Sequence, residues 1–131
     1  MKKTLAFFVV FSFLLSLGSA FAVPHKRYDA TTKTCRVLTF YNSGWVSDGN
    51  TIFKKSCKTC HHQGNDKGAT FLYTESFTPK GWNRVFAERY PACARNGSWA
   101  SLSQEQILKL NDFLYWNGWG TYDPNSAESC G

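Results

Sequence analysis

The first hydrophobic segment of the chain runs from Leu5 to Leu17 and lies between charged and small residues. Lys2 and Lys3 precede it, and Ala20-Phe21-Ala22 follows it. Its length of about 13 residues is short of the roughly 20 that a membrane-spanning helix needs. This order of residues is typical of a secretory signal peptide that is cleaved after Ala22. We therefore expect residues 1–22 to be removed and residues 23–131 to be periplasmic or otherwise exported, with no membrane span after cleavage.

The residues after this segment show little periodicity before Gly49. Residues 23–48 mix polar turn residues with one short β-like run, Arg36–Tyr41, and a turn follows it at residues 42–44. An irregular N-terminal extension with room for a hairpin is expected here. From Gly49 the pattern becomes helical, and Asp48 or Asn50 can cap a first helix that runs into residues 57–61. Gly, Asn and Asp at residues 64–68 then predict a loop.

Capping residues mark the starts of two further helices. Thr78 followed by Pro79 predicts the start of the second helix, and Pro91 ends it. Ser103 and Gln106 form a capping box at the start of the third, which ends near residue 118. The predicted fold class is all-α, with residues 23–48 as the extension and residues 49–131 as one helical domain with a C-terminal tail.

The net charge of the chain and the distribution of its basic residues indicate which kinds of macromolecule it could bind. The chain has 15 basic and 9 acidic residues, and loss of Lys2 and Lys3 leaves 13 basic residues and a net charge of +4. The basic residues are scattered, which argues against nucleic-acid binding. The nearest approach to a cluster is Lys54, Lys55 and Lys58, which predicts either a solvated face or a docking rim for an acidic partner.

The residues Cys57-Lys58-Thr59-Cys60-His61 form a C-x-x-C-H sequence, the attachment signature of a c-type haem. On a helix, side chains three and four residues apart share one face. Two thiols can then bond to the porphyrin edge while the His61 imidazole reaches the iron as the proximal ligand. A disulfide, a thioredoxin-like redox pair and a zinc site are the alternatives. The helical pattern before Cys57 and the lack of a second compact ligand pair favour haem over these.

The chain also resembles the small monohaem class I cytochromes c over about residues 49–116. The residues that match this family's first helix, G-x-x-x-F-x-x-x-C-x-x-C-H, are Gly49, Phe53, Cys57, Cys60 and His61. The residues that match its closing helix are Leu102, Ser103, Leu110, Phe113 and Leu114. The resemblance implies helices packed around one covalent haem c, with the first and last helices crossing at Gly49.

Two departures from the family concern the two sides of the iron. The family's proximal loop has a proline whose carbonyl fixes the imidazole tautomer, but no proline lies between His61 and Pro79. Another carbonyl must therefore contact His61. The family's distal ligand is a methionine, and the only methionine here is Met1.

Cys93 and His25 are the candidate distal ligands. Cys93 lies nine residues before Leu102, about where the family places its methionine, and thiolate is a known haem ligand. His25 lies near the start of the mature chain, where a solvated side chain is the alternative. Lys80, Lys109, a water molecule or an empty position stay open. His62 is expected at the surface or against a propionate.

The remaining cysteines are odd in number. After two thioethers, Cys35, Cys93 and Cys130 are left, and three thiols cannot all pair within one chain. One of the three is left over as a ligand or a reactive thiol, and for Cys93 the alternative to binding iron is a structural disulfide with Cys130 or Cys35. If Cys93 binds iron, Cys35 and Cys130 would tie the extension to the tail. The tryptophans are Trp45, Trp82, Trp99, Trp116 and Trp119, of which Trp82 and Trp99 are the expected haem contacts.

These observations favour a one-electron carrier that is not an enzyme and that exchanges electrons with redox proteins, either acidic or membrane-bound. Without a methionine ligand, its reduction potential is expected to be lower than in methionine-ligated relatives. The alternatives are a haem sensor or catalytic subunit with an open or Cys-ligated distal site, and a disulfide-stapled binding protein without haem.

Overall fold

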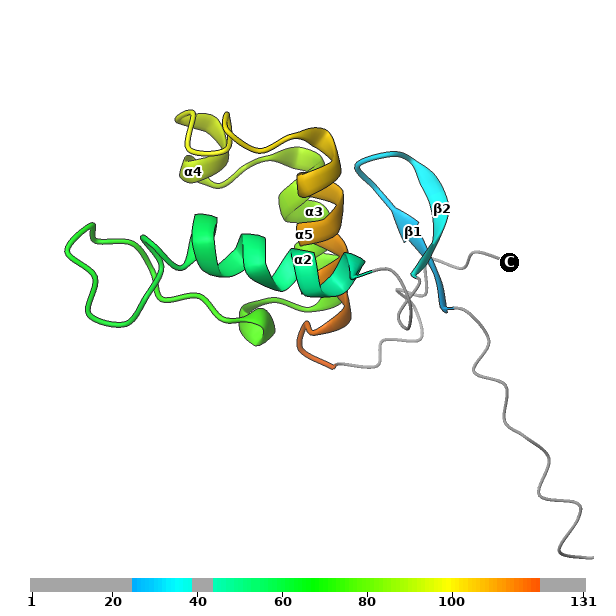
Figure 1. Cartoon of the computed structure of the whole chain (residues 1–131), viewed down its shortest axis with the longest axis horizontal. Coiled ribbons are helices and arrows are strands. Elements are labelled where there is room, and N and C mark those ends of the chain that lie inside the picture. The colour runs from blue at the N-terminus through cyan, green and yellow to red at the C-terminus, as the bar shows by residue number, and fades with distance from the viewer. Residues whose placement is uncertain (1–24, 39–43, 121–131) are drawn as a thin grey trace, which may run out of the picture.

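The computed structural model describes residues 25–38 and 44–120. The predicted signal peptide and Cys130 lie outside these residues. The elements, in chain order, are β1 (His25–Asp29), β2 (Thr34–Leu38), α2 (Trp45–Ile52), the π-helix η1 (Phe53–Cys57), the 3₁₀-helix η2 (Thr74–Ser76), α3 (Pro79–Glu88), α4 (Ala92–Arg95) and α5 (Gln104–Trp116). The helices α2, α3 and α5 pack together, and the hairpin of β1 and β2 lies beside α5 (Figure 1).

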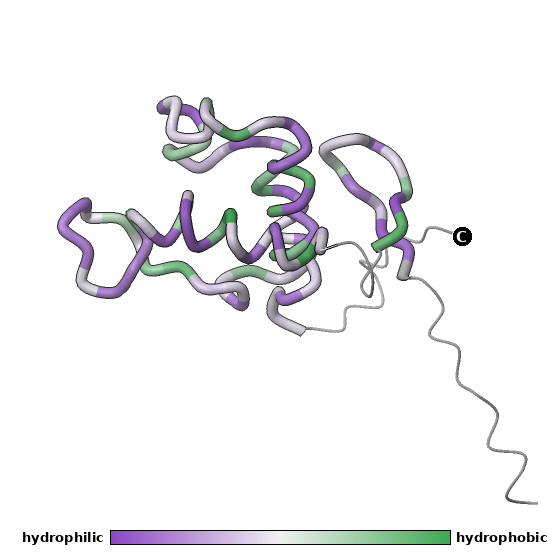
Figure 2. The backbone as a smooth tube through the Cα atoms, viewed as in Figure 1, coloured by the Kyte–Doolittle hydropathy of each residue, from purple (hydrophilic) through white to green (hydrophobic). Residues whose placement is uncertain are grey.

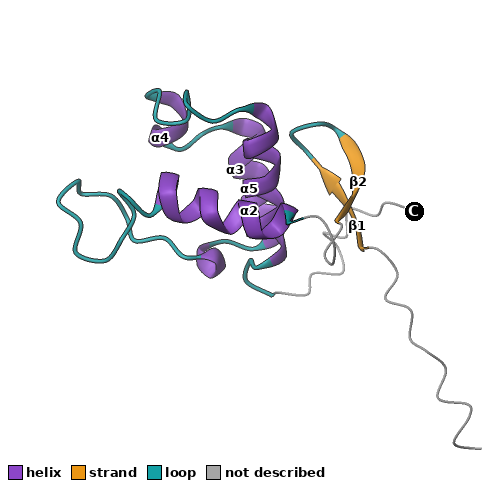
Figure 3. Ribbon diagram, in the orientation of Figure 1, coloured by secondary structure: helices purple, strands orange, loops and turns teal. Residues whose placement is uncertain are grey.

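The prediction of an all-α chain is wrong, because part of the N-terminal extension is a two-stranded antiparallel sheet (Figure 3). β1 pairs with β2 in a register that places Arg27 opposite Arg36. The hairpin does not have the hydrophobic alternation by which half-buried strands are recognised. Its buried side chains in β1 are charged instead: Arg27 is 1% exposed and Asp29 is fully buried.

An ionic cluster holds the hairpin against the helices. The Arg27 guanidinium donates through Nε to the Asp112 carboxylate of α5 at 2.8 Å and contacts Asp29 at 3.3 Å. Arg36 donates to both oxygens of Asp112, at 2.6 and 2.8 Å, and through Nε to Asp29 at 2.8 Å. Asn83 of α3 accepts a further bond from Arg27 at 3.2 Å. Two arginines and two aspartates thus compensate each other's charge where hydrophobic contact would otherwise be expected.

The helices α2 and α5 cross at Gly49. A Cβ atom at position 49 would overlap the main-chain oxygen of Lys109 and the Cβ of Phe113. One turn later, the Phe53 ring lies against the Phe113 ring, with 6.0 Å between centroids. The expected crossing of the first and last helices at this glycine is confirmed.

Side chains from α3, α5 and η1 form the core. The buried members of this cluster are Phe53, Trp82, Val85, Phe86, Ile107, Leu110 and Leu114. Figure 2 shows hydrophobic positions of α3 and α5 where these two helices run beside each other. No helix among the described residues is both long enough and apolar enough to span a bilayer.

The predicted helix starts are confirmed in two cases and wrong in one. Thr78 caps α3, and Ser103 and Gln106 form the capping box of α5. The first helix begins at Trp45 rather than at Gly49, and Asp48 bonds Lys109 Nζ at 2.8 Å instead of capping. The second ends at Glu88, before Pro91, and the short helix α4 was not predicted.

Candidate functional site

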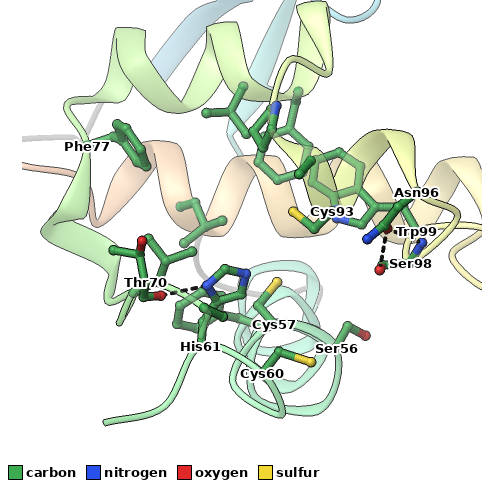
Figure 4. A pocket seen from close by; sticks show the side chains of 18 of the residues that line it. Ser56, Cys57, Cys60, His61, Thr70, Phe77, Cys93, Asn96, Ser98 and Trp99 are labelled. Carbon is green, nitrogen blue, oxygen red and sulfur yellow. Dashed lines mark hydrogen bonds between the residues drawn. The ribbon is translucent and has the colours of Figure 1, made fainter. Parts of the chain in front are cut away.

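A cavity of about 620 Å³ lies between the C-x-x-C-H segment and the segment that contains α4. This volume is in the range of about 300 to 1,000 Å³ that ligand pockets have. Much of its wall is apolar, with Phe53, Phe77, Trp82, Phe86 and Trp99 among the lining residues. Three thiols and one imidazole also line it, those of Cys57, Cys60, Cys93 and His61 (Figure 4).

The local backbone brings Cys57, Cys60 and His61 to one wall. The helix widens into η1, where Lys58 N donates to Phe53 O at 3.0 Å, five residues back. Such π-turns occur frequently at functional sites. A tight turn follows, in which the amides of Cys60 and His61 both donate to Cys57 O, at 3.2 and 2.9 Å. The segment is therefore not the continuous α-helix expected, but the three side chains still line the same cavity.

The two thiols of this wall differ in their surroundings. Cys57 is half-buried and Cys60 is exposed. Burial raises the pKa of the Cys57 thiol to about 12, and the nearby Cys93 and Cys60 thiols add to this rise. Cys57 is therefore a neutral thiol in the folded chain, because the cavity does not stabilise its thiolate.

The His61 ring is held by a main-chain carbonyl. Its Nδ1 lies 2.7 Å from the Thr70 carbonyl oxygen. A carbonyl oxygen only accepts, so Nδ1 carries the proton and donates, and Nε2 is left with its lone pair. The expectation that a carbonyl other than that of a proline contacts His61 is confirmed. A hydrogen bond of this kind fixes the tautomer and orientation of a metal-ligating histidine.

The loop between His61 and Thr70 is built by Asn65. Its side-chain amide donates to the carbonyls of His62 and Ala69, at 2.9 and 2.7 Å, and its Oδ1 accepts from the amides of Lys67 and Ala69, both at 3.0 Å. The turn residues predicted a loop here. They did not predict which carbonyl would meet His61, because any residue type can supply a main-chain oxygen.

The opposite wall contains Cys93. This residue belongs to α4, directly after Pro91 and Ala92, and it is half-buried with a free thiol. Figure 4 shows its sulfur directed into the space between its own wall and the one with Cys57 and His61. Trp99 lies behind it and stacks on Phe86, with 5.2 Å between ring centroids. The structure thus brings Cys93 to the same cavity as the C-x-x-C-H residues.

None of the other candidate ligands is among the described residues that line the cavity. His25 is the first residue of β1, and its side chain lies outside the described part of the structure, whereas residues 26–29 of that strand do not line the cavity. His62 is exposed, and its Nδ1 contacts the Gln63 carbonyl at 2.9 Å. Lys109 is paired with Asp48 and Glu105, and Lys80 is exposed.

Two of the five tryptophans line the cavity. These are Trp82 and Trp99, the two that were expected near the haem. Trp82 donates through its ring nitrogen to Thr74 O at 2.6 Å. Trp116 and Trp119 are exposed, and Trp45 donates to Asp112 at 2.8 Å in the ionic cluster.

The described cysteines differ in whether they form a disulfide. Cys35 is disulfide-bonded, whereas Cys57, Cys60 and Cys93 are free thiols. The alternative of a structural disulfide at Cys93 is therefore not what the structure contains. Cys130 lies outside the described residues, and its predicted pairing with Cys35 stays a prediction. Within residues 25–38 and 44–120, no three His, Cys, Asp or Glu side chains are grouped closely enough to hold one metal ion.

Comparisons with protein-family models, curated protein sequences and solved structures find no match for this chain.

Proposed function

We propose that this chain is an exported monohaem c-type cytochrome that carries single electrons between redox proteins. The observation that supports this is the wall formed by Cys57, Cys60 and His61. Two thiols at the spacing of a c-type haem attachment sequence line an apolar cavity beside an imidazole whose Nε2 is free to bind a metal. Haem is apolar over most of its surface, so these residues fit it.

In this proposal Cys57 and Cys60 form the two thioether bonds, and His61 Nε2 is the proximal ligand of the iron. The haem, when bound, supplies the one-electron chemistry. The chain excludes water with buried side chains such as Trp82 and Phe86, and it keeps the His61 tautomer fixed through Thr70. Cys60 is exposed, so the attachment edge lies where a partner protein can approach.

Cys93 is the proposed distal ligand. Haem iron accepts His, Cys, Met or Tyr as axial ligands. Among the lining residues, those of these types are Cys57, Cys60, His61, Tyr90 and Cys93. The first three share one wall, and Tyr90 is 42% exposed with its ring next to Arg84. Cys93 alone combines a free thiol with a place on the opposite wall. An anionic thiolate there would give a lower reduction potential than methionine does.

The mass of the purified protein tests the proposed function. We expect protein made in cells that attach c-type haem to be the mature chain of residues 23–131 plus one haem, and the haem to remain attached under denaturing conditions. Replacing both Cys57 and Cys60 with alanine should abolish the attachment, whereas Cys93→Ala should retain it. A mass without one added haem would reject the cytochrome proposal and favour a haem-free binding protein.

Carbon monoxide separates the carrier from the alternative of a haem sensor or catalytic subunit. A carrier with Cys93 on the iron should show a reduced spectrum that carbon monoxide leaves unchanged. Ready binding of carbon monoxide to the wild type would favour an open distal site, and with it the sensor or catalytic subunit.

A further inference from the structure

Lys58 differs from its lysine neighbours in where its ammonium group lies. Lys54 and Lys55 are exposed, whereas Lys58 is half-buried. Its Nζ donates to the Leu72 carbonyl at 2.6 Å and to the His61 carbonyl at 3.4 Å. The same atom lies 4.0 Å from the centroid of the Phe71 ring. Lys58 is therefore bound within the chain rather than presented to a docking partner.

The groups that Lys58 contacts frame the carbonyl that holds His61. Thr70 accepts the bond from His61 Nδ1, and Phe71 and Leu72 are the next two residues. The Leu72 amide donates back to the His61 carbonyl at 3.1 Å. The main chain and the ring of His61 are thus both hydrogen-bonded to residues 70–72. The Lys58 ammonium adds a third link, because it donates to the carbonyls of both His61 and Leu72.

The chemistry of the ammonium group suits this role. It has three donors and no acceptor, and hydrogen bonds from a charged donor are stronger than those between neutral groups. Two donors meet carbonyl oxygens, and the charge lies near the electron-rich ring of Phe71. Without Lys58, two hydrogen bonds would still join residues 70–72 to His61. These are the bond from the Leu72 amide to the His61 carbonyl and the bond from His61 Nδ1 to the Thr70 carbonyl.

We propose that Lys58 is a positioning residue for the His61 ring: it fixes residues 70–72 so that the Thr70 carbonyl stays in line with His61 Nδ1. This role rests on the proposed function for its effect on the iron, because the Nδ1 bond tunes the basicity of a ligating imidazole. The contacts themselves belong to the chain and are open to measurement without haem.

The exchange of the His61 Nδ1 proton with solvent, followed by NMR in the reduced haem-loaded protein, tests the proposal. Lys58→Met keeps the length of the side chain and removes its donors, so exchange should be about tenfold faster, as expected for loss of a charged hydrogen bond. Lys58→Arg should stay close to the wild-type rate because its guanidinium still donates to carbonyls. The matched control is Lys55→Met, which removes an exposed charge and should leave the rate unchanged.

An unchanged rate in Lys58→Met would overturn the proposal, and so would an equal increase in Lys55→Met, which would assign the effect to charge alone. If Lys58→Met does not fold, Phe71→Ala replaces it, because this exposed ring can be removed with its neighbours in place. Faster exchange in Phe71→Ala would then support the proposal, and a wild-type rate would oppose it.

A measurement on the haem-free chain keeps this inference separate from the proposed function. If the mass shows no haem, the cytochrome proposal fails, and the exchange of the Leu72 amide becomes the readout for Lys58. Faster amide exchange in Lys58→Met than in Lys55→Met would support the positioning role, and equal rates would reject it.

Discussion

Gly49 of α2 packs directly against Phe113 of α5, so closely that a Cβ atom at position 49 would lie 2.5 Å from the Phe113 Cβ. Neither partner can yield easily, because the Lys109 main chain lies on the same side. We expect Gly49→Ala to force the helices apart and to lower the free energy of unfolding by about 1 to 3 kcal/mol, the usual cost of overpacking. Chemical denaturation measures this.

Gly120→Ala is the control for that substitution. Apart from its chain neighbours, no atom of the described residues lies within 4 Å of a Cβ built at Gly120, so the stability of this variant should match that of the wild type. Equal stability of Gly49→Ala and Gly120→Ala would contradict the assignment of Gly49 to the helix crossing.

The ionic cluster predicts a large effect of removing one of its charges. Arg27 and Asp112 are both about 1% exposed. Loss of Arg27 leaves Asp29 and Asp112 sharing Arg36, so one buried negative charge of the cluster is uncompensated, which costs about 3 to 5 kcal/mol. Arg27→Met should therefore lower the free energy of unfolding by that amount, measured by denaturation. Lys26→Met, at the exposed neighbouring position of β1, should change little. Similar losses in both variants would show that the hairpin does not depend on the buried pair.

Acid should weaken the same cluster. Burial alone raises the pKa of Asp29, but the charges of Arg27 and Arg36 outweigh it, and the pKa lies below its ordinary value of 3.8. The folded state thus binds fewer protons than the unfolded state, and the stability that Asp29 contributes above pH 3.8 is lost as the pH falls through its folded pKa. Denaturation at a series of acid pH values should give a shallower loss for Asp29→Asn than for the wild type.

Asp66→Asn serves as the comparison for the acid series, because the ion pair that Asp66 forms with Lys67 is exposed on both sides. Its loss of stability with falling pH should run parallel to that of the wild type. Parallel curves for Asp29→Asn and the wild type would contradict the prediction.

The helices show how far local sequence determines this fold. The caps of α3 and α5 were predictable because each is made by residues within three positions of one another, Thr78 with Gly81 and Ser103 with Gln106. A hairpin was allowed for in the extension, and the β-like run from Arg36 overlaps β2, but β1 was not predicted because its inward side chains are Arg27 and Asp29. The partner of Arg27 on α5, Asp112, is more than 80 residues away. When buried charges are compensated by residues so far away in the sequence, the strand does not show the alternation of hydrophobic and polar residues by which strands are predicted.

The candidate site shows the same division. The C-x-x-C-H residues were found because their spacing is local, and Cys93 was found from its position before the last helix, where the resemblance places the distal ligand. The Thr70 carbonyl and the Lys58 contacts were not, because they depend on how the loop closes. A main-chain oxygen has no residue type to reveal it, and the lysine next to two others looked like part of an exposed group.

The two thiols of the attachment sequence should react at different rates in the haem-free chain. A thiolate is the reactive form of cysteine, and burial holds the pKa of Cys57 at about 12. At mildly alkaline pH we therefore expect iodoacetamide to label Cys60 faster than Cys57, with mass spectrometry of the peptides as the readout. In denaturant the two rates should converge. Equal rates in the folded chain would contradict the burial of Cys57.

Cys93, on the wall opposite His61, is expected to supply a thiolate ligand to the iron, and Cys93→Ala should remove it. Low-temperature electron paramagnetic resonance of the oxidised haem protein should show low-spin iron with a thiolate ligand in the wild type. In Cys93→Ala this signal should give way to high-spin iron, and the reduced protein should gain carbon monoxide binding. The midpoint potential should also rise, because an anionic ligand that stabilises the oxidised iron is removed.

Two further variants make that result specific to Cys93. Ser98→Ala alters the same wall without touching a thiol and should keep the wild-type spectrum. His25→Ala should also keep it, because residues 26–29, the part of β1 whose side chains are described, do not border the cavity. A wild-type spectrum in Cys93→Ala together with a changed one in His25→Ala would transfer the ligand to the histidine. Unchanged low-spin spectra in both would rule out each of them, since a ligand cannot be removed without altering the coordination of the iron.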